Sequence, residues 1–237
     1  MPDIAYTGVF HFVGALIAAW GAWRSWQNYK ITNSQYYALF FRIGLGVAIS
    51  MGLYSIYTFP EFRDREFLQF AWLVGVPIMY WAFVHAVHFT FKAIQRERLG
   101  LFYVIFLIIA MSLLMIASLV WPPQSYVAEG IVVWNPQYPM NIIHPALMTL
   151  AMLPMTILFL SRSDYTPRTF KSFLLGLAFL LSSAGGAMAA RLTDLTILRY
   201  VHLMMLVGFL LFGLVFLIYP REESGAEPTS MPPTEVS

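Results

Sequence analysis

The sequence contains no cysteine among its 237 residues. This absence excludes disulfide bonds, thiolate metal sites and covalent attachment of a c-type haem. Charge is also scarce, since Asp, Glu, Lys and Arg make up 11% of the chain. With 59% hydrophobic residues and a mean hydropathy of +0.68, such a chain is excluded from the water-soluble class. The small net charge of +2 gives no reason to expect a nucleic-acid partner.

Seven long apolar runs account for most of the chain, each close to the roughly 20 residues that a helix needs to cross a bilayer. Backbone polar groups must be satisfied inside lipid, so we expect these runs to be helices. The sequence therefore predicts an all-α integral membrane bundle of seven transmembrane helices in residues 1–220, placed in the plasma or inner membrane. Residues 221–237, rich in Pro, Ser, Thr and Glu, are predicted to be a disordered cytoplasmic tail. The runs are Ile4–Trp23, Tyr36–Tyr57, Phe70–Phe91, Leu99–Trp121, Ile142–Leu160, Phe173–Ala190 and Leu198–Tyr219.

Positive charge is distributed unequally between the two ends of these runs. Cytoplasmic loops of membrane proteins carry an excess of Lys and Arg, so the richer side predicts the cytoplasm. The N-terminus is therefore expected outside and the C-terminus inside. Nine basic residues lie on the predicted inner side, namely Arg24, Lys30, Lys92, Arg96, Arg98, Arg162, Arg168, Lys171 and Arg221, against Arg63, Arg65, Arg191 and Arg199 outside.

The one long connection, Pro122–Tyr138, falls on the predicted outer side. Its stretch Tyr126–Trp134 is β-branched and aromatic around Glu129-Gly130, which is compatible with a short hairpin over the bundle. The favoured interpretation is an interfacial loop whose Trp121, Trp134 and Tyr138 lie at headgroup level, and the alternative is a lid over an outer pocket.

Small residues recur near the end of the sixth run. Ser182, Gly186 and Ala190 are four positions apart, which is the spacing that lets two helix backbones approach closely. We expect tight helix packing here, with a hinge as the alternative.

Three histidines fall near the outer ends of their runs. His11, His144 and His202 lie on the first, fifth and seventh runs, and ionisable side chains within spans are costly enough to mark function. At a shared depth they predict a common ligand-binding or metal site with Trp134 nearby. The alternative is three separate, neutral, hydrogen-bonding histidines of the membrane interface.

A second polar group lies nearer the predicted inner side. His85 and His88 are three residues apart and share one helix face, and Arg42 lies about two turns into the second run. Arg42 is expected to extend its side chain to the headgroups, and the alternative is an inner-side anion contact or a switch pair.

A haem b remains open in this pattern, because the outer histidines could supply one axial pair. His85 and His88 lie on one helix and cannot clamp a haem between them, so a two-haem arrangement is disfavoured. The cofactor is therefore unknown at this stage, with haem b or a metal ion as the two candidates.

The chain resembles the seven-helix N-terminal sensor region of bacterial and archaeal histidine kinases. The resemblance rests on Trp72–Ile78 running to Phe83 and a basic loop, on Arg168–Leu177 with Gly176, and on the predicted order of the ends with a long fourth loop. A kinase module would follow the seventh run, where this chain has a short tail. The resemblance implies a stand-alone sensory or partner-binding membrane domain.

The plan of the runs also resembles that of sugar-efflux-type transporters, which have three helices on each side of a central one. The first three and last three runs share one orientation, and His11 and His144 occupy similar places in them. The Pro-Gln pairs Pro123-Gln124 and Pro136-Gln137 lie in the outer loop, unlike those of that family.

No catalytic constellation accompanies these features. We therefore expect a receptor-like or accessory protein that binds a small ligand or a partner, such as a separate signalling or redox protein, from the outer side without catalysis. The alternatives are a haem b electron-transfer subunit and a small-solute or metal transporter.

The charge distribution makes a prediction about topology. A reporter fused after Arg221 should be cytoplasmic, and one inserted near Gly130 should be outside, because Lys and Arg are retained on the cytoplasmic side. Protease protection or reporter activity in intact cells measures this directly. Opposite labelling at both positions would reverse the orientation.

Overall fold

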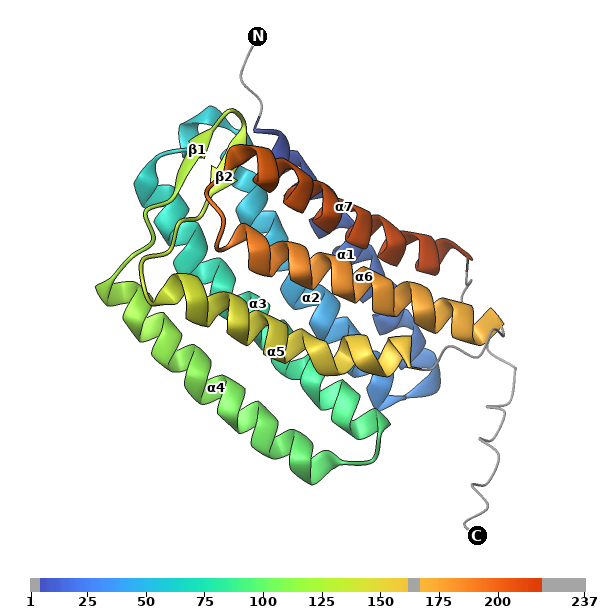
Figure 1. The fold of residues 1–237 in the computed structure, drawn as a ribbon. Coiled ribbons are helices and arrows are strands. Elements are labelled where there is room, and N and C mark those ends of the chain that lie inside the picture. Colours follow the sequence, from blue (N-terminus) through green and yellow to red (C-terminus); the bar gives the residue numbers. More distant parts are fainter. Residues whose placement is uncertain (1–4, 162–166, 219–237) are drawn as a thin grey trace.

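The computed structural model describes residues 5–161 and 167–218 (Figure 1). The predicted tail lies outside these residues. The described helices and strands are α1 (Tyr6–Thr32), α2 (Gln35–Ser55), the 3-10 turns η1 (Ile56–Thr58) and η2 (Pro60–Phe62), α3 (Arg65–Ala93), α4 (Glu97–Val120), β1 (Tyr126–Ala128), β2 (Ile131–Val133), α5 (Met140–Leu160), α6 (Pro167–Ala189) and α7 (Leu195–Ile218).

Each of the predicted apolar runs corresponds to one α-helix, so the all-α prediction is confirmed. Six of the helices, α2 to α7, are long and apolar enough to cross a bilayer, and the chain is a multi-pass membrane protein. Helix α1 is not among these six. The seventh span and the orientation stay predictions.

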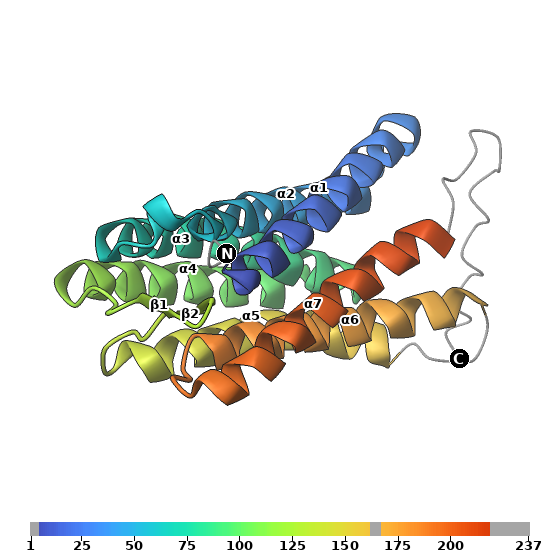
Figure 2. The same cartoon turned by 90° about the horizontal axis from the view of Figure 1, so that it is seen from above.

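Six helices form a closed ring around the long axis of the molecule. Helix α1 packs on α2 and α7, α3 packs on α2 and α5, and α6 packs on α5 and α7 (Figures 1 and 2). Helix α4 lies outside this ring against α3 and α5, and little of it is buried. The ring thus consists of two three-helix halves, α1–α3 and α5–α7.

Proline chemistry explains how α4 attaches to the ring. Pro154 has no backbone N–H, so the carbonyl of Leu150, four residues earlier in α5, loses its usual helical partner. The hydroxyl of Tyr103 on α4 donates to that carbonyl at 2.5 Å. The hydrogen bond that the proline removes is therefore replaced from a neighbouring helix, as burial in lipid requires.

The predicted hairpin is present in the long connection. Strand β1 pairs antiparallel with β2, and the turn residues Glu129 and Gly130 have φ of 49° and 75°, the left-handed values that a tight hairpin turn needs. All three residues of β2 are 0% exposed, and Trp134 is 5% exposed. The expectation of Trp134 at headgroup level is therefore wrong, because its ring is enclosed by the bundle. Trp121 and Tyr138 are 51% and 77% exposed, as the interfacial interpretation expects.

The close helix contact involves different residues from those that the sequence suggested. A Cβ added at Gly186 would meet only the end of the Met148 side chain, so this glycine does not mark a backbone contact. A Cβ added at Gly208 on α7 would lie 2.8 Å from the backbone N of Ser182 and 3.0 Å from the carbonyl O of Ala178. Of the predicted stripe, Ser182 takes part in the contact, and its glycine partner comes from α7.

This contact predicts opposite effects for two substitutions in the same helix. Gly208→Ala should destabilise the protein by about 1–3 kcal/mol, because backbone atoms of α6 cannot yield to the new methyl group. At Gly213 the nearest atom would be an Ile17 side-chain carbon at 3.7 Å, so Gly213→Ala should be neutral or stabilising by up to about 1 kcal/mol. Melting temperatures in detergent measure both, and equal shifts would contradict the assignment.

Candidate functional site

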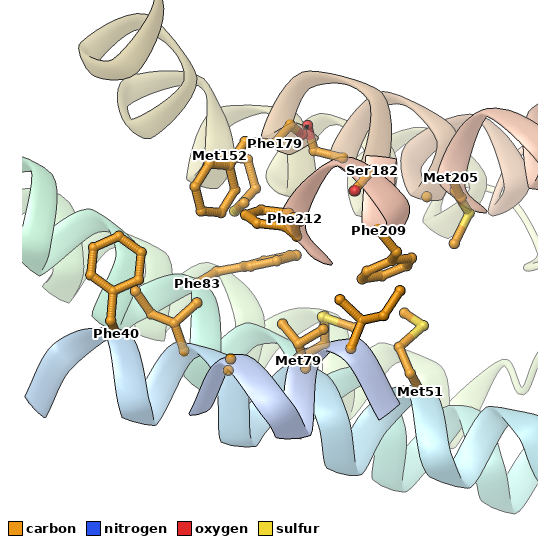
Figure 3. A pocket seen from close by; sticks show the side chains of 18 of the residues that line it. Phe40, Met51, Met79, Phe83, Met152, Phe179, Ser182, Met205, Phe209 and Phe212 are labelled. Carbon is orange, nitrogen blue, oxygen red and sulfur yellow. Dashed lines mark hydrogen bonds between the residues drawn. The ribbon is translucent and has the colours of Figure 1, made fainter. Parts of the chain in front are cut away.

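The ring of helices encloses two adjoining cavities. The larger, called here the apolar chamber, has a volume of about 110 Å³, far above the 10–15 Å³ that one water molecule needs. Figure 3 shows side chains of α2 and α3 facing those of α6 and α7 across it. Its walls are mainly Phe and Met, including Phe40, Met51, Met79, Phe83, Met152, Phe179, Met205, Phe209 and Phe212.

Three serines, Ser25, Ser182 and Ser183, interrupt this apolar lining. The Ser182 side chain lies on the wall (Figure 3), and its hydroxyl oxygen is buried without a hydrogen-bond partner among the described residues. A buried hydroxyl without a partner costs free energy, which a bound group able to hydrogen-bond would recover.

The smaller cavity, called here the polar chamber, has a volume of about 60 Å³ and lies toward the hairpin. It shares Met51, Met79, Phe83, Met148, Gly186 and Met205 with the apolar chamber, so the two chambers adjoin each other along the bundle. The residues that distinguish it are His11, Tyr54, Trp72, Tyr80, Trp134 and His144.

His11 heads a chain of hydrogen bonds that ends on the hairpin. Its Nδ1 lies 2.8 Å from the Tyr57 hydroxyl, which donates to the Thr7 hydroxyl at 3.0 Å. Thr7 donates in turn to the carbonyl of Gly130 at 3.3 Å. Helix α1, the turn after α2 and the hairpin are therefore joined by one chain of hydrogen bonds.

His144 is paired with a tyrosine in the other half of the ring. Its Nδ1 lies 3.0 Å from the hydroxyl of Tyr80 on α3, and that hydroxyl also reaches the His144 carbonyl at 3.2 Å. The imidazole packs against Trp72, with ring centres 4.8 Å apart. Trp72 in turn contacts Trp134, which contacts Tyr54 and Tyr57, so an aromatic wall joins the two histidine–tyrosine pairs.

His202 lies behind His11 and does not line either chamber. The two rings meet edge to face with centres 5.6 Å apart, and His202 Nδ1 donates to the Leu198 carbonyl at 2.8 Å. Its Nε2 is buried and has no hydrogen-bond partner in the described part of the chain.

The structure thus brings the predicted outer residues together. His11, His144 and Trp134 line one chamber, and His202 packs on His11. The prediction that these three histidines form a metal site is wrong, because among the described residues no three His, Asp or Glu side chains could hold one metal ion. The Nδ1 atoms are directed to tyrosines and a carbonyl instead. Nor does the direct ring contact between His11 and His202 favour a haem clamped between them.

The predicted inner group lies elsewhere. Arg42 and His88 are exposed on the outside of α2 and α3, and both act electrostatically on His85. Neither chamber is lined by any of the three. The sequence grouped them correctly, but they form no part of the cavity system.

Sequence reasoning missed the partners of the histidines. These partners all lie in the apolar runs, where Tyr, Trp and Thr belong to the ordinary composition of a membrane-spanning helix. They are Thr7, Tyr54, Tyr57, Trp72 and Tyr80. The sequence did offer one indication of these partners. A buried imidazole in lipid needs a hydrogen-bond partner, so a hydroxyl at the same depth as a histidine is a candidate.

Comparison with protein-family models, with curated proteins and with solved structures finds no match.

The hydrogen-bond chain predicts a specific stability effect. Thr7→Val should cost about 1–3 kcal/mol and loosen the hairpin, because Tyr57 and the Val132 N–H, 3.1 Å from the Thr7 hydroxyl, both lose a buried partner. Thr149→Val is the matched control, since its exposed hydroxyl bonds only to Pro145 in its own helix. Detergent melting and hydrogen exchange across residues 126–133 measure the difference, and equal behaviour of the two variants would refute the chain.

Proposed function

We propose that this chain is a receptor-like or accessory membrane protein that binds one small, lipid-soluble ligand inside its helical ring, without catalysis. The observation that carries the proposal is the pair of adjoining cavities, the apolar and the polar chamber, inside the ring. Ligand sites are commonly concave and mostly apolar, with a few convergent polar groups that fix orientation. The two chambers together have this composition.

The chamber walls indicate the chemistry of the ligand. Met and Phe side chains of the apolar chamber suit a hydrocarbon body, and methionine adapts its shape readily to what it contacts. The polar chamber offers the His11 and His144 imidazoles with aromatic faces beside them. The expected ligand is an amphiphile with a hydrogen-bonding, ring-shaped head and an apolar body.

The proposal includes the predicted topology. With the N-terminus outside and α1 as the seventh span, the polar chamber lies near the outer surface and the hairpin covers it. Trp134 forms part of the chamber wall, so the hairpin serves as the lid that the sequence suggested. A lipid-soluble ligand could reach the ring from the bilayer without displacing this lid.

One observation favours transport of a small solute as a second candidate. The cavity lies between two three-helix halves whose first helices each carry a chamber histidine, His11 on α1 and His144 on α5. The third helices repeat as well, because Trp72 and His202 each lie seven residues after the first residue of their helix and each packs on the histidine of the other half. Counterflow in proteoliposomes would favour this candidate, whereas saturable binding without counterflow favours the receptor-like one.

A separate signalling or redox protein would be a suitable partner for a receptor-like protein and for a transporter alike. The resemblance to sensor regions supports a separate signalling protein, and the alternative of a haem b subunit would supply a redox one. Neither partner is needed for the ligand test that follows.

The ligand proposal predicts saturable binding of a probe with an apolar tail and a hydrogen-bonding head. Decyl-1,4-benzoquinone should raise the melting temperature of the purified protein in a concentration-dependent manner, because a ligand of the folded state stabilises it. Decylbenzene, which has no hydrogen-bonding head, should bind about tenfold more weakly, the equivalent of one hydrogen bond. His144→Phe should remove most of the difference between the two probes.

Two tryptophan substitutions separate the cavity from the surface. Met148→Trp fills the space shared by both chambers and should abolish the stabilisation, whereas Met188→Trp on the exposed face of α6 should leave it unchanged. If Met148→Trp responds to the quinone as the wild type does, the probe binds elsewhere and the proposal fails.

A further inference from the structure

A row of polar side chains follows the seam between α2 and α3, at the end of the bundle opposite the hairpin. Lys92 near the end of α3 donates a hydrogen bond to the Gln35 side chain at the start of α2, which fixes the two helices in register. Arg42 lies seven residues after Gln35, and His85 lies seven residues before Lys92. Both are therefore about 10 Å further into the bundle than that hydrogen bond.

The spacing places these side chains on one seam. Residues seven apart lie on the same face of a helix, so Arg42 shares the face of Gln35 and His85 shares the face of Lys92. His88 lies between His85 and Lys92 on α3. The electrostatic effect of Arg42 and His88 on His85 is in accord with this placement.

No protein group neutralises this seam in the described residues. Neither Arg42 nor His88 has a hydrogen bond or an ion pair there, and His85 Nδ1 is buried without a partner. Within residues 5–161 and 167–218, the only acidic side chain at this end is Glu97, which belongs to α4 and not to α2 or α3. A guanidinium within a membrane-crossing helix is costly when it is left without a counter-ion.

The surface beyond the cationic row is apolar. Trp81 packs edge to face on His85 with ring centres 4.7 Å apart, and it is exposed on its other side. Leu45 and Ile49 follow Arg42 on the same face of α2 and are also exposed. The seam therefore changes from cationic to hydrocarbon-like along the direction in which a phospholipid changes from headgroup to acyl chain.

We propose that this seam is a binding site for the phosphate of an anionic membrane lipid. The Arg42 guanidinium presents two parallel N–H groups to the phosphate, a geometry that arginine favours over lysine. His88 and Lys92 flank the headgroup, and the acyl chains lie along Trp81 and Leu45. The site shares no residue with the two chambers, so it is independent of the proposed ligand function.

Lipid retention in native mass spectrometry tests the site. The full chain is reconstituted in nanodiscs of equal parts phosphatidylglycerol and phosphatidylcholine, then released, and the lipids that stay bound are counted. The wild type should retain phosphatidylglycerol over phosphatidylcholine by about tenfold, as one charge-assisted hydrogen-bonded contact predicts. Arg42→Gln should lose this preference.

Arg98→Gln is the matched control, because it removes one positive charge at the same end of the bundle from α4, outside the seam. It should keep the preference. Equal retention of both lipids by the wild type, or equal losses in the two variants, would overturn the proposal. Displacement of the bound lipid by inorganic phosphate would identify a free anion as the ligand instead.

Two further measurements complete the test. The melting temperature of Arg42→Gln in phosphatidylcholine alone shows whether the variant folds. If it does not fold, the double variant His88→Gln with Lys92→Gln replaces it and should likewise lose the preference for phosphatidylglycerol. If Arg42→Gln instead releases a co-purifying protein and leaves lipid retention unchanged, the seam serves a protein partner and the lipid proposal is wrong.

Discussion

The hydroxyl of Thr7 is the contact on which the hairpin end of this protein depends. It accepts from Tyr57 and from the Val132 N–H, and it donates to the Gly130 carbonyl. One hydroxyl offers one proton and two lone pairs, so its hydrogen-bonding capacity is fully used. Helix α1, the turn after α2 and the hairpin therefore meet at a single buried atom.

The polar chamber takes its form from that contact. Tyr57 is held by Thr7 and in turn holds the ring of His11, while the docked hairpin carries Trp134 into the chamber wall. The opposite wall has its own tyrosine, Tyr80, which holds His144 from α3. Away from the hairpin the walls change to Met and Phe, with the exception of a few serines such as Ser182. Polarity thus falls along the bundle, and an elongated ligand would have a defined orientation in it.

Much of this fold could be predicted from the sequence because membrane constraints act locally. Apolar runs of spanning length predicted each helix, and Glu129-Gly130 between β-branched residues predicted the hairpin. Depth along a helix can also be read from sequence, which is why His11, His144 and Trp134 were grouped correctly.

The direction in which a residue faces around its helix was harder to predict. A helix that is apolar on all sides gives no sign of which side faces a neighbour, so Gly186 was taken for a backbone contact that Gly208 makes. The same uncertainty concealed Tyr57 and Tyr80, whose hydroxyls matter only once the facing helix is known. It also allowed a metal trio to be expected where His202 in fact turns to its own backbone and packs behind His11.

The hydrogen bonds between Thr7 and the hairpin have a consequence for the order in which the protein assembles. Thr7 and Val132 are 125 residues apart in the chain, so the first helix is synthesised long before its hydrogen-bond partner exists. Contacts of such separation form late, because the chain between them must be ordered first. Arg199 on α7 then ties the hairpin turn through Glu129, which delays completion of this end until the seventh helix is in place. During insertion His11 therefore reaches the membrane before the residues that will enclose it, and this end of the bundle closes as one of the last events of assembly.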